Sequence, residues 1–214
     1  MEVKKISPPV TPFLQIKLDQ EVVDYLWKII DIAKTTNENH KSKLVGNISQ
    51  SLLLEDIDSF FFKYVCIPLV KYYRENNSIG EDPVSQNSLM GPNSQLVLDK
   101  LWVNYQYQTE FNPYHDHTGV YSFAIWLKIP YDWEDQKKLP QYSEIKDKNI
   151  KAGCFEFEYN DILGGITNYR YKLSPKFEGY MVFFPAKLRH CVYPFYKTDK
   201  PRISIAGNLS YLPV

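Results

Sequence analysis

Hydrophobic positions near the start of the chain follow first a strand pattern and then a helical one. Residues 13–18 alternate apolar and polar side chains, which predicts a short strand. Asp19 is a suitable N-cap for a helix that follows. The apolar positions behind it recur at helical spacing on one face: Val22, Leu26, Ile29, Ile30 and Ala33. The pattern therefore predicts a strand that leads into an amphipathic helix.

A second helix is predicted for residues 51–76. Its apolar stripe consists of Ile57, Phe61, Tyr64 and Val65. Pro68 lies inside this pattern and should kink or divide the helix, because proline lacks an N–H and its ring clashes with the preceding turn. The polar stretches 35–47 and 80–93 are predicted to be loops.

After about residue 95 the helical period disappears and strand patterns dominate. The predicted strands are 96–108 (as one strand or two), 120–129, 154–159, 179–184, 190–193 and 202–211. Residues 130–152 are charged and contain prolines, so we expect an exposed insertion, with a lid or substrate lip as the alternative. The count of strands is then six to eight.

Helices followed by a run of strands are typical of an α+β architecture. We expect one domain over residues 1–214, in which residues 1–94 form a mainly helical support and residues 95–214 form a jelly-roll core. In such a fold the N-terminal helices would pack on one of the two sheets. No internal repeat interrupts this layout.

Composition narrows the class of protein. Lys and Arg number 25, as do Asp and Glu, and this zero balance argues against a nucleic-acid-binding surface. The three cysteines contain no C-x-x-C pair, so they predict neither a disulfide framework nor a zinc knuckle. No stretch approaches the roughly 20 apolar residues of a membrane helix, and residues 1–14 lack the apolar run of a secretory signal. We therefore expect a cytoplasmic protein with no membrane partner.

Three of the four histidines fall in the strand-rich half. His115 and His117 are two residues apart, so in extended chain both imidazoles face the same side while Asp116 faces away. His190 begins another predicted strand. If the three imidazoles converge inside a barrel, they form a metal site with open positions, suited to iron, copper, nickel or zinc. His40 lies in a polar loop and is predicted to be solvated.

A turn or bulge near Thr118 and Gly119 would change this picture. In that case Asp116, and not His117, could be the second ligand. Asp116 could also orient one of the imidazoles from outside the ligand set.

Arg202 and Ser204 share one face of the last predicted strand. A guanidinium can bind a carboxylate through two hydrogen bonds, and a hydroxyl two residues further on can add a third. A charged side chain in an otherwise apolar strand is costly unless it is paired. The pair therefore indicates a carboxylate clamp; the alternative is an arginine on an edge strand, exposed to solvent.

Four segments together resemble a known family. They are LWVNY, NPYHDHTGVYSF, VFFPAKLRH and RISIAGN, and the resemblance covers residues 96–211. Their order and spacing are similar to those of the oxygenases that depend on 2-oxoglutarate and iron(II), in particular to prolyl-hydroxylase-like oxygenases of phages and bacteria. If the gene is of phage origin, the compartment would be the host cytoplasm.

The resemblance implies a double-stranded β-helix, which is a jelly roll, and a metal site at His115, His117 and His190. It also implies that Arg202, assisted by Ser204, binds the far carboxylate of 2-oxoglutarate. Such enzymes use O2 to convert 2-oxoglutarate to succinate and CO2 while a substrate C–H bond is hydroxylated. The primary substrate stays open, with a peptide or protein proline as one candidate.

Two further residues are candidates for binding the co-substrate. Asn104 and Tyr105 precede the H-x-H element on a predicted strand, where they face opposite sides, so only one can point inward. The alternative for Tyr105 is a place in the core. Most of the superfamily has a carboxylate where this chain has His117. Three neutral imidazoles would leave an iron(II) site at +2, where a carboxylate would leave it at +1.

Two other functions stay open. One is a three-histidine metal dioxygenase that does not use 2-oxoglutarate, which would leave an inward Arg202 without a role. The other is a non-catalytic jelly-roll module for binding or for a virion, since the fold alone does not decide function. Retention of all three histidines and Arg202 argues against such a module.

Overall fold

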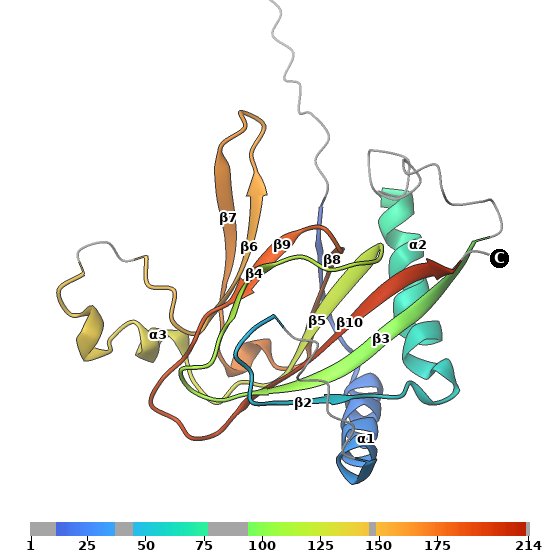
Figure 1. Cartoon of the computed structure of the whole chain (residues 1–214), viewed down its shortest axis with the longest axis horizontal. Helices are drawn as coiled ribbons and strands as arrows, with labels where there is room; N and C mark the ends of the chain where they lie inside the picture. The colour runs from blue at the N-terminus through green and yellow to red at the C-terminus, as the bar shows by residue number, and fades with distance from the viewer. Residues whose placement is uncertain (1–11, 37–44, 77–93, 146–148, 213–214) are drawn as a thin grey trace, which may run out of the picture.

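The computed structural model describes residues 12–36, 45–76, 94–145 and 149–212. Within them the strands form two antiparallel sheets, one in the order β1-β8-β5-β10-β3-β2 and one in the order β4-β9-β6-β7 (Figure 1). The strands are β1 Leu14–Lys17, β2 Gln50–Leu53, β3 Gln95–Gln106, β4 Asn112–His115, β5 Tyr121–Lys128, β6 Cys154–Asn160, β7 Ile166–Lys172, β8 Tyr180–Pro185, β9 Arg189–Val192 and β10 Arg202–Leu212. The predicted α+β class is thus confirmed.

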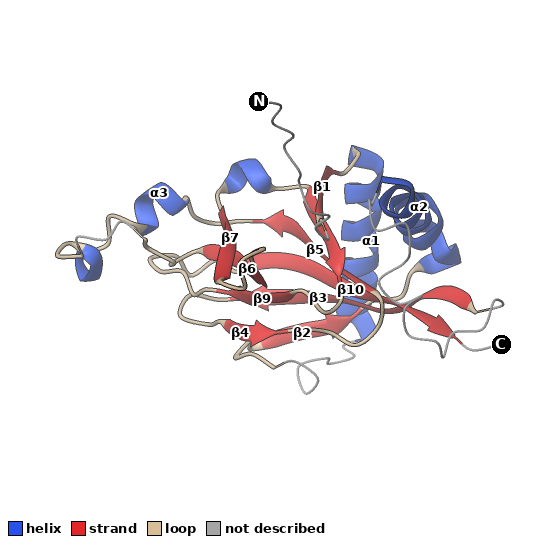
Figure 2. Cartoon of the chain, turned by 90° about the horizontal axis from the view of Figure 1, so that it is seen from above, coloured by secondary structure: helices blue, strands red, loops and turns tan. Residues whose placement is uncertain are grey.

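Helices α1 (Gln20–Thr36) and α2 (Ile67–Asn76) lie on one side of the six-stranded sheet (Figure 2). Their apolar faces share a buried core with β3, β5, β8 and β10. The short helix α3 (Trp133–Gln136) follows β5. In the part of the chain that is described, no helix has both the length and the hydrophobicity needed to cross a bilayer.

The central strand β5 is buried on both faces, which explains its long apolar run. Tyr121, Phe123 and Ile125 belong to the core under the helices. Trp126, one residue further on, faces the space between the two sheets, where it packs on Phe155 of the opposite sheet. Alternation therefore still operates in this strand, but both sides are apolar.

The prediction of one helix from residue 51 is wrong for its first part. Residues 50–53 form β2, which pairs with β3 and brings Leu52 opposite Val103. The helix begins later because the Asp56 carboxylate accepts hydrogen bonds from the N–H groups of Phe61 and Phe62, both at 2.9 Å. Pairing with a distant strand has overridden the local helical pattern.

The predicted disturbance at Pro68 takes the form of a wider helical turn. Residues Phe62–Cys66 are π-helical, and α2 starts immediately after them. A proline two residues into the next segment cannot donate to the turn before it, and a π turn accommodates the missing bond.

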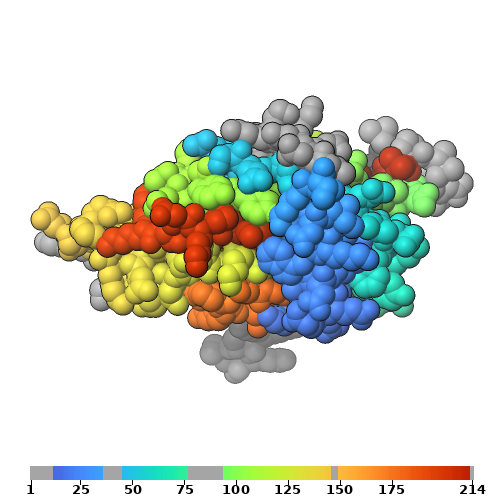
Figure 3. Space-filling view, turned by 90° about the horizontal axis from the view of Figure 1, so that it is seen from below, coloured from blue at the N-terminus to red at the C-terminus, as the bar shows by residue number. Residues whose placement is uncertain are grey.

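The expectation that residues 130–152 are simply exposed is wrong. Trp133, Leu139 and Ile150 are each at most 7% exposed. Gln136 also exchanges two hydrogen bonds with the Tyr196 backbone, at 2.8 and 2.9 Å. The segment projects from one end of the molecule, in yellow in Figure 3, but is anchored at its base. Its action as a lid stays a prediction.

Two strands of the smaller sheet were not predicted. β7 pairs with β6 along its whole length, yet most of its side chains are exposed, so it shows no apolar alternation. β4 has four residues, too few for a recognisable period. β4 matters for the site, because it carries His115 and lies at one edge of this sheet.

Candidate metal centre

The smaller sheet brings two of the three predicted histidines together. His115, the last residue of β4, is the register partner of His190 on β9, so the two side chains lie side by side. His117 follows two residues later, and its backbone N–H donates to the Ala186 carbonyl at 2.9 Å. One ligand nitrogen from each of the three imidazoles lies within 4.8 Å of the others.

Backbone carbonyls set the proton positions on two of these rings. The carbonyl of Pro113 lies 2.7 Å from Nδ1 of His115, and the carbonyl of Leu188 lies 3.0 Å from Nδ1 of His190. A carbonyl can only accept, so each Nδ1 carries the proton and each Nε2 keeps its lone pair. Nε2 of His117 lies 3.2 Å from Nε2 of His190. A cation between these lone pairs fits the arrangement well.

Burial keeps the three imidazoles neutral. It lowers the pKa of His115, lowers the pKa of His117 to about 4 and places the pKa of His190 well below its ordinary range. The neighbouring imidazoles lower the pKa of His117 and His190 further. Phenylalanine rings surround His190, with Phe184 at 4.9 Å between ring centroids. Neutral imidazole is the form that binds a metal ion.

A cavity of about 260 Å³ extends from the histidines along β10. Alternate residues of that strand line it, from Arg202 through Ser204 and Ala206 to Asn208. Asn104 lines it from the neighbouring strand β3, as expected for an inward-facing polar residue. The cavity thus has a polar wall that ends at Arg202.

Arg202 is 1% exposed, so it is not the solvent-exposed edge residue of the alternative interpretation. Its Nη1 donates to the Tyr131 hydroxyl at 2.5 Å, and its Nη2 donates to Oε1 of Gln106. The rings of Tyr131 and Phe195 lie 5.9 and 5.7 Å from the guanidinium carbon. Among the described residues no carboxylate pairs with Arg202, so its buried charge is left uncompensated.

Tyr105 lies elsewhere, and Asp116 lines the cavity without joining the histidine group. Tyr105 is not in the cavity: it belongs to the core on the helix side of β3, so its assignment to co-substrate binding is wrong. The physical reason is the strand alternation that turns Asn104 inward. Asp116 has a 44% exposed side chain that forms an ion pair with Lys187 at 3.2 Å, and it is not part of the histidine group. His40 lies outside the described residues.

Sequence reasoning missed two partners of the arginine. Gln106 lies two residues beyond Asn104 on the same strand face, and it is the register partner of Arg202. A polar side chain in an otherwise apolar strand is the sequence signal that could have identified Gln106 as a partner of a buried polar group. Tyr131 lies after β5 in the predicted insertion 130–152, and no sequence pattern points to it.

The sequence of residues 100–208, more than half of the chain, matches the family model described as "Putative 2OG-Fe(II) oxygenase". The chain belongs to this family. The 2OG-Fe(II) oxygenases use Fe(II) and 2-oxoglutarate, with O2 as the second co-substrate, so the protein is an oxidoreductase. The predicted family and the predicted cofactors, Fe(II) and 2-oxoglutarate, are thus confirmed.

One solved structure supports the fold, and a second aligns less well. An oxidoreductase of the 2OG-Fe(II) oxygenase family from Burkholderia pseudomallei aligns with a TM-score of 0.51 at 10% identity, over 92% of this chain and 84% of that chain. A prolyl-4-hydroxylase from Pseudomonas putida aligns at 0.48 and 14% identity, over 92% of this chain and 91% of that chain. A search of curated proteins finds no match. At these identities the likeness to the Burkholderia structure concerns the fold alone.

Proposed function

We propose that this 2OG-Fe(II) oxygenase binds iron through His115, His117 and His190 and binds the far carboxylate of 2-oxoglutarate through Arg202. The observation that carries the proposal is the buried guanidinium with neutral partners in the same cavity as three neutral imidazoles. A dianionic co-substrate would supply the missing negative charge to both ends of the cavity.

Arg202 has donors to spare for such a ligand. A guanidinium carries five N–H groups, and Tyr131 and Gln106 accept one each. The aromatic rings beside it limit access of water, which strengthens a charge-assisted bond. Ser204 and Asn104 line the same cavity; Ser204 would assist Arg202 at the far carboxylate, and Asn104 would hydrogen-bond the co-substrate from β3. Oδ1 of Asn104 is buried without a hydrogen-bond partner; because 2-oxoglutarate offers only acceptors, the amide would bind it by turning its Nδ2 toward the co-substrate.

The iron would supply the activation of O2 that couples decarboxylation of 2-oxoglutarate to oxidation of the primary substrate. The residues of the chain do the rest: they keep metal positions open, orient the co-substrate and exclude water. We propose hydroxylation of a C–H bond as the outcome. A peptidyl proline is the candidate substrate, and its support is the resemblance of the sequence motifs to the prolyl-hydroxylase-like group.

The proposal includes the jelly-roll arrangement and a single domain over residues 1–214. Both sheets contribute to the cavity, since β10 supplies Arg202 and β9 supplies His190. Phe13, just before the edge strand β1, packs on Tyr169 of the edge strand β7 at 5.2 Å between ring centroids, which joins one pair of sheet edges.

A dioxygenase without 2-oxoglutarate explains the histidines but leaves the buried guanidinium without an anion. A non-catalytic module leaves both without a role. The deciding experiment is anaerobic titration of the protein with Fe(II) and then with 2-oxoglutarate, followed by its visible charge-transfer band and by succinate formation after O2 is admitted. A band that appears with Fe(II) and 2-oxoglutarate together supports the proposal. If Fe(II) binds but 2-oxoglutarate produces neither band nor succinate, the co-substrate assignment is refuted.

A further inference from the structure

The strand that carries His115 has little backbone support of its own. β4 lies at the edge of the smaller sheet, and its register with β9 is given at Asn112, opposite Val192, and at His115, with an irregularity between the two. A short edge strand of this kind can shift relative to its neighbour. A metal site, however, tolerates displacements of only a few tenths of an ångström.

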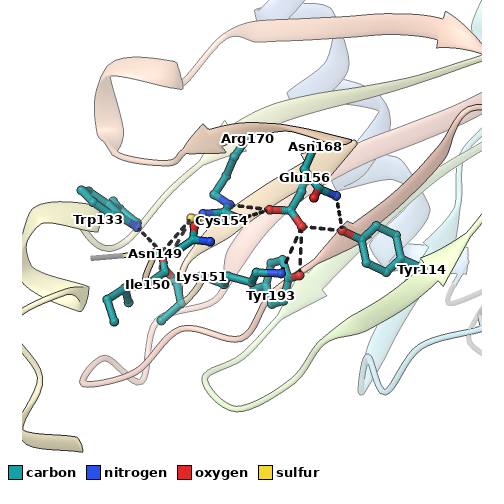
Figure 4. A network of polar contacts seen from close by, with 11 residues as sticks. Tyr114, Trp133, Asn149, Ile150, Lys151, Cys154, Glu156, Asn168, Arg170 and Tyr193 are labelled. Carbon is teal, nitrogen blue, oxygen red and sulfur yellow. Dashed lines mark hydrogen bonds and ion pairs between the residues drawn. The ribbon is translucent and has the colours of Figure 1, made fainter. Parts of the chain in front are cut away.

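A side chain on the outer face of this sheet makes the missing connection. Tyr114 is adjacent to His115 and points to the opposite face, away from the cavity. Its hydroxyl donates to Oε1 of Glu156 on β6 (Figure 4). Because β9 lies between them, β4 and β6 are two strand spacings apart, about 9.5 Å, and the long Tyr114 side chain crosses this distance over β9. Tyr114 therefore ties the edge strand to the middle of the sheet.

Glu156 is a fixed anchor for this bond. Its side chain is fully buried, and it forms ion pairs with Arg170 on β7 and with Lys151 at 3.5 Å. The Tyr193 hydroxyl donates to the same Oε1 at 3.1 Å. Figure 4 shows these groups converging on the carboxylate from separate segments. Burial would raise the pKa of Glu156, but the bonds from Tyr114 and Arg170 outweigh it, and the pKa is lowered. The anchor is therefore ionised at neutral pH.

Tyr114 is held in turn. Nδ2 of Asn168 on β7 donates to its hydroxyl at 3.0 Å, and the guanidinium of Arg189 lies 5.5 Å from its ring centre. Burial and the bond to Glu156 raise the pKa of Tyr114, so its hydroxyl stays protonated at neutral pH and can donate.

We infer that Glu156 and Tyr114 form a clamp that sets the position of His115 relative to His190, and that both act as positioning residues for the metal centre. The inference rests on the proposed function, because it assumes that the histidines bind a metal ion. The network costs the fold a buried charge. The network offsets this cost in function if it fixes β4, the strand that carries His115.

The chain offers a matched control. Tyr193 donates to the same oxygen of Glu156 but directly follows β9, so its bond to Glu156 does not hold β4, the strand of His115. Tyr114→Phe and Tyr193→Phe thus each remove a hydroxyl from one anchor, and only the first frees the strand of His115. Both should lower the Tm. Anaerobic titration with cobalt(II), which needs no turnover, then separates stability from positioning.

We expect Tyr114→Phe to weaken cobalt(II) binding about tenfold and to change the visible ligand-field spectrum, since residues that orient ligands typically affect metal affinity by about 10–100-fold. Tyr193→Phe should stay within about twofold of the parent protein, with an unchanged spectrum. Equal affinities for the two variants would overturn the clamp while leaving the metal site intact. Failure of the parent protein to bind cobalt(II) would overturn the metal site itself.

A second variant decides the matter if Tyr114→Phe does not fold. Glu156→Gln keeps an acceptor oxygen for both tyrosines but removes its charge, so the bond to Tyr114 weakens without being lost. We expect a two- to fivefold loss of cobalt(II) affinity. Unchanged affinity and spectrum in Glu156→Gln would refute the clamp.

Discussion

Replacement of Arg202 by methionine tests the co-substrate site most directly, because methionine retains much of the volume and removes the charge. Hydrogen bonds to a charged group contribute about 1.5–3 kcal/mol each. A carboxylate held by two of them would lose about 3–6 kcal/mol, and at about 1.4 kcal/mol per tenfold change the Kd for 2-oxoglutarate should rise by about 10²–10⁴.

The stability of the protein without ligand should change much less. Removal of a buried charge that has no acidic partner relieves a desolvation penalty, which stabilises the fold. In opposition, Oε1 of Gln106 loses its donor, at about 1–3 kcal/mol. Tyr131 remains satisfied, because its hydroxyl also donates to the Gly153 carbonyl at 3.0 Å. The two effects largely offset each other, so the free energy of unfolding of Arg202→Met should lie within about 2 kcal/mol of the parent value.

The assay is anaerobic calorimetric titration of the metal-loaded protein with 2-oxoglutarate, together with urea unfolding of the metal-free protein. Arg74→Met is the control, since Arg74 lies on α2, on the other side of the larger sheet. It should leave the Kd for 2-oxoglutarate unchanged. If the Kd of Arg202→Met for 2-oxoglutarate is within threefold of the parent value, the assignment of Arg202 as the carboxylate-binding residue is incorrect.

Four other outcomes are expected. His190→Ala should weaken cobalt(II) binding more than a hundredfold in a titration, with an unchanged circular dichroism spectrum; binding near the parent level would remove it from the ligand set. Asp116→Asn should keep cobalt(II) affinity within threefold, and a larger loss would identify Asp116 as a ligand. In metal-free protein the free energy of unfolding should fall from about pH 6.5 towards pH 4, by about 3 kcal/mol for His117 alone, because only the unfolded chain takes up its proton there. Urea unfolding of His117→Gln should show a smaller fall, since His115 and His190 still contribute; an unchanged fall would contradict the assignment to His117. Gly207→Ala should lower the free energy of unfolding by about 1–3 kcal/mol, since an added Cβ would clash with the Phe123 ring; an unchanged Tm would contradict this packing.

The sequence predicted the parts of the site that depend on strand alternation. His115 and His117 were expected on one side of the chain, and the structure brings both to His190. Arg202 and Ser204 were expected on one strand face, and both line the cavity. Such relations depend on spacing within one segment or on a motif, so they need no knowledge of how distant segments meet.

The parts that depend on tertiary contacts could not be predicted. β2 looked helical, and only its pairing with β3 makes it a strand. Tyr131 reaches Arg202 across 71 positions of the sequence, and Tyr114 reaches Glu156 across 42. Glu156 lies in a predicted strand, but its pattern alone does not show that the side chain is fully buried and paired with Arg170 and Lys151. Local pattern carried no information about these partners.

The charges around the cavity explain how a site with three histidines could work. The imidazoles contribute no negative charge. Of the described residues that line the cavity only Asp116 is acidic, and its partly exposed carboxylate is paired to Lys187. An iron(II) ion and Arg202 would together place three positive charges along this cavity, and a 2-oxoglutarate dianion would offset two of them. With a carboxylate ligand the metal would already be partly neutralised. As metal ligands, the three histidines would make metal and co-substrate depend more strongly on each other for charge balance, and by linkage each should raise the affinity of the other by the same factor.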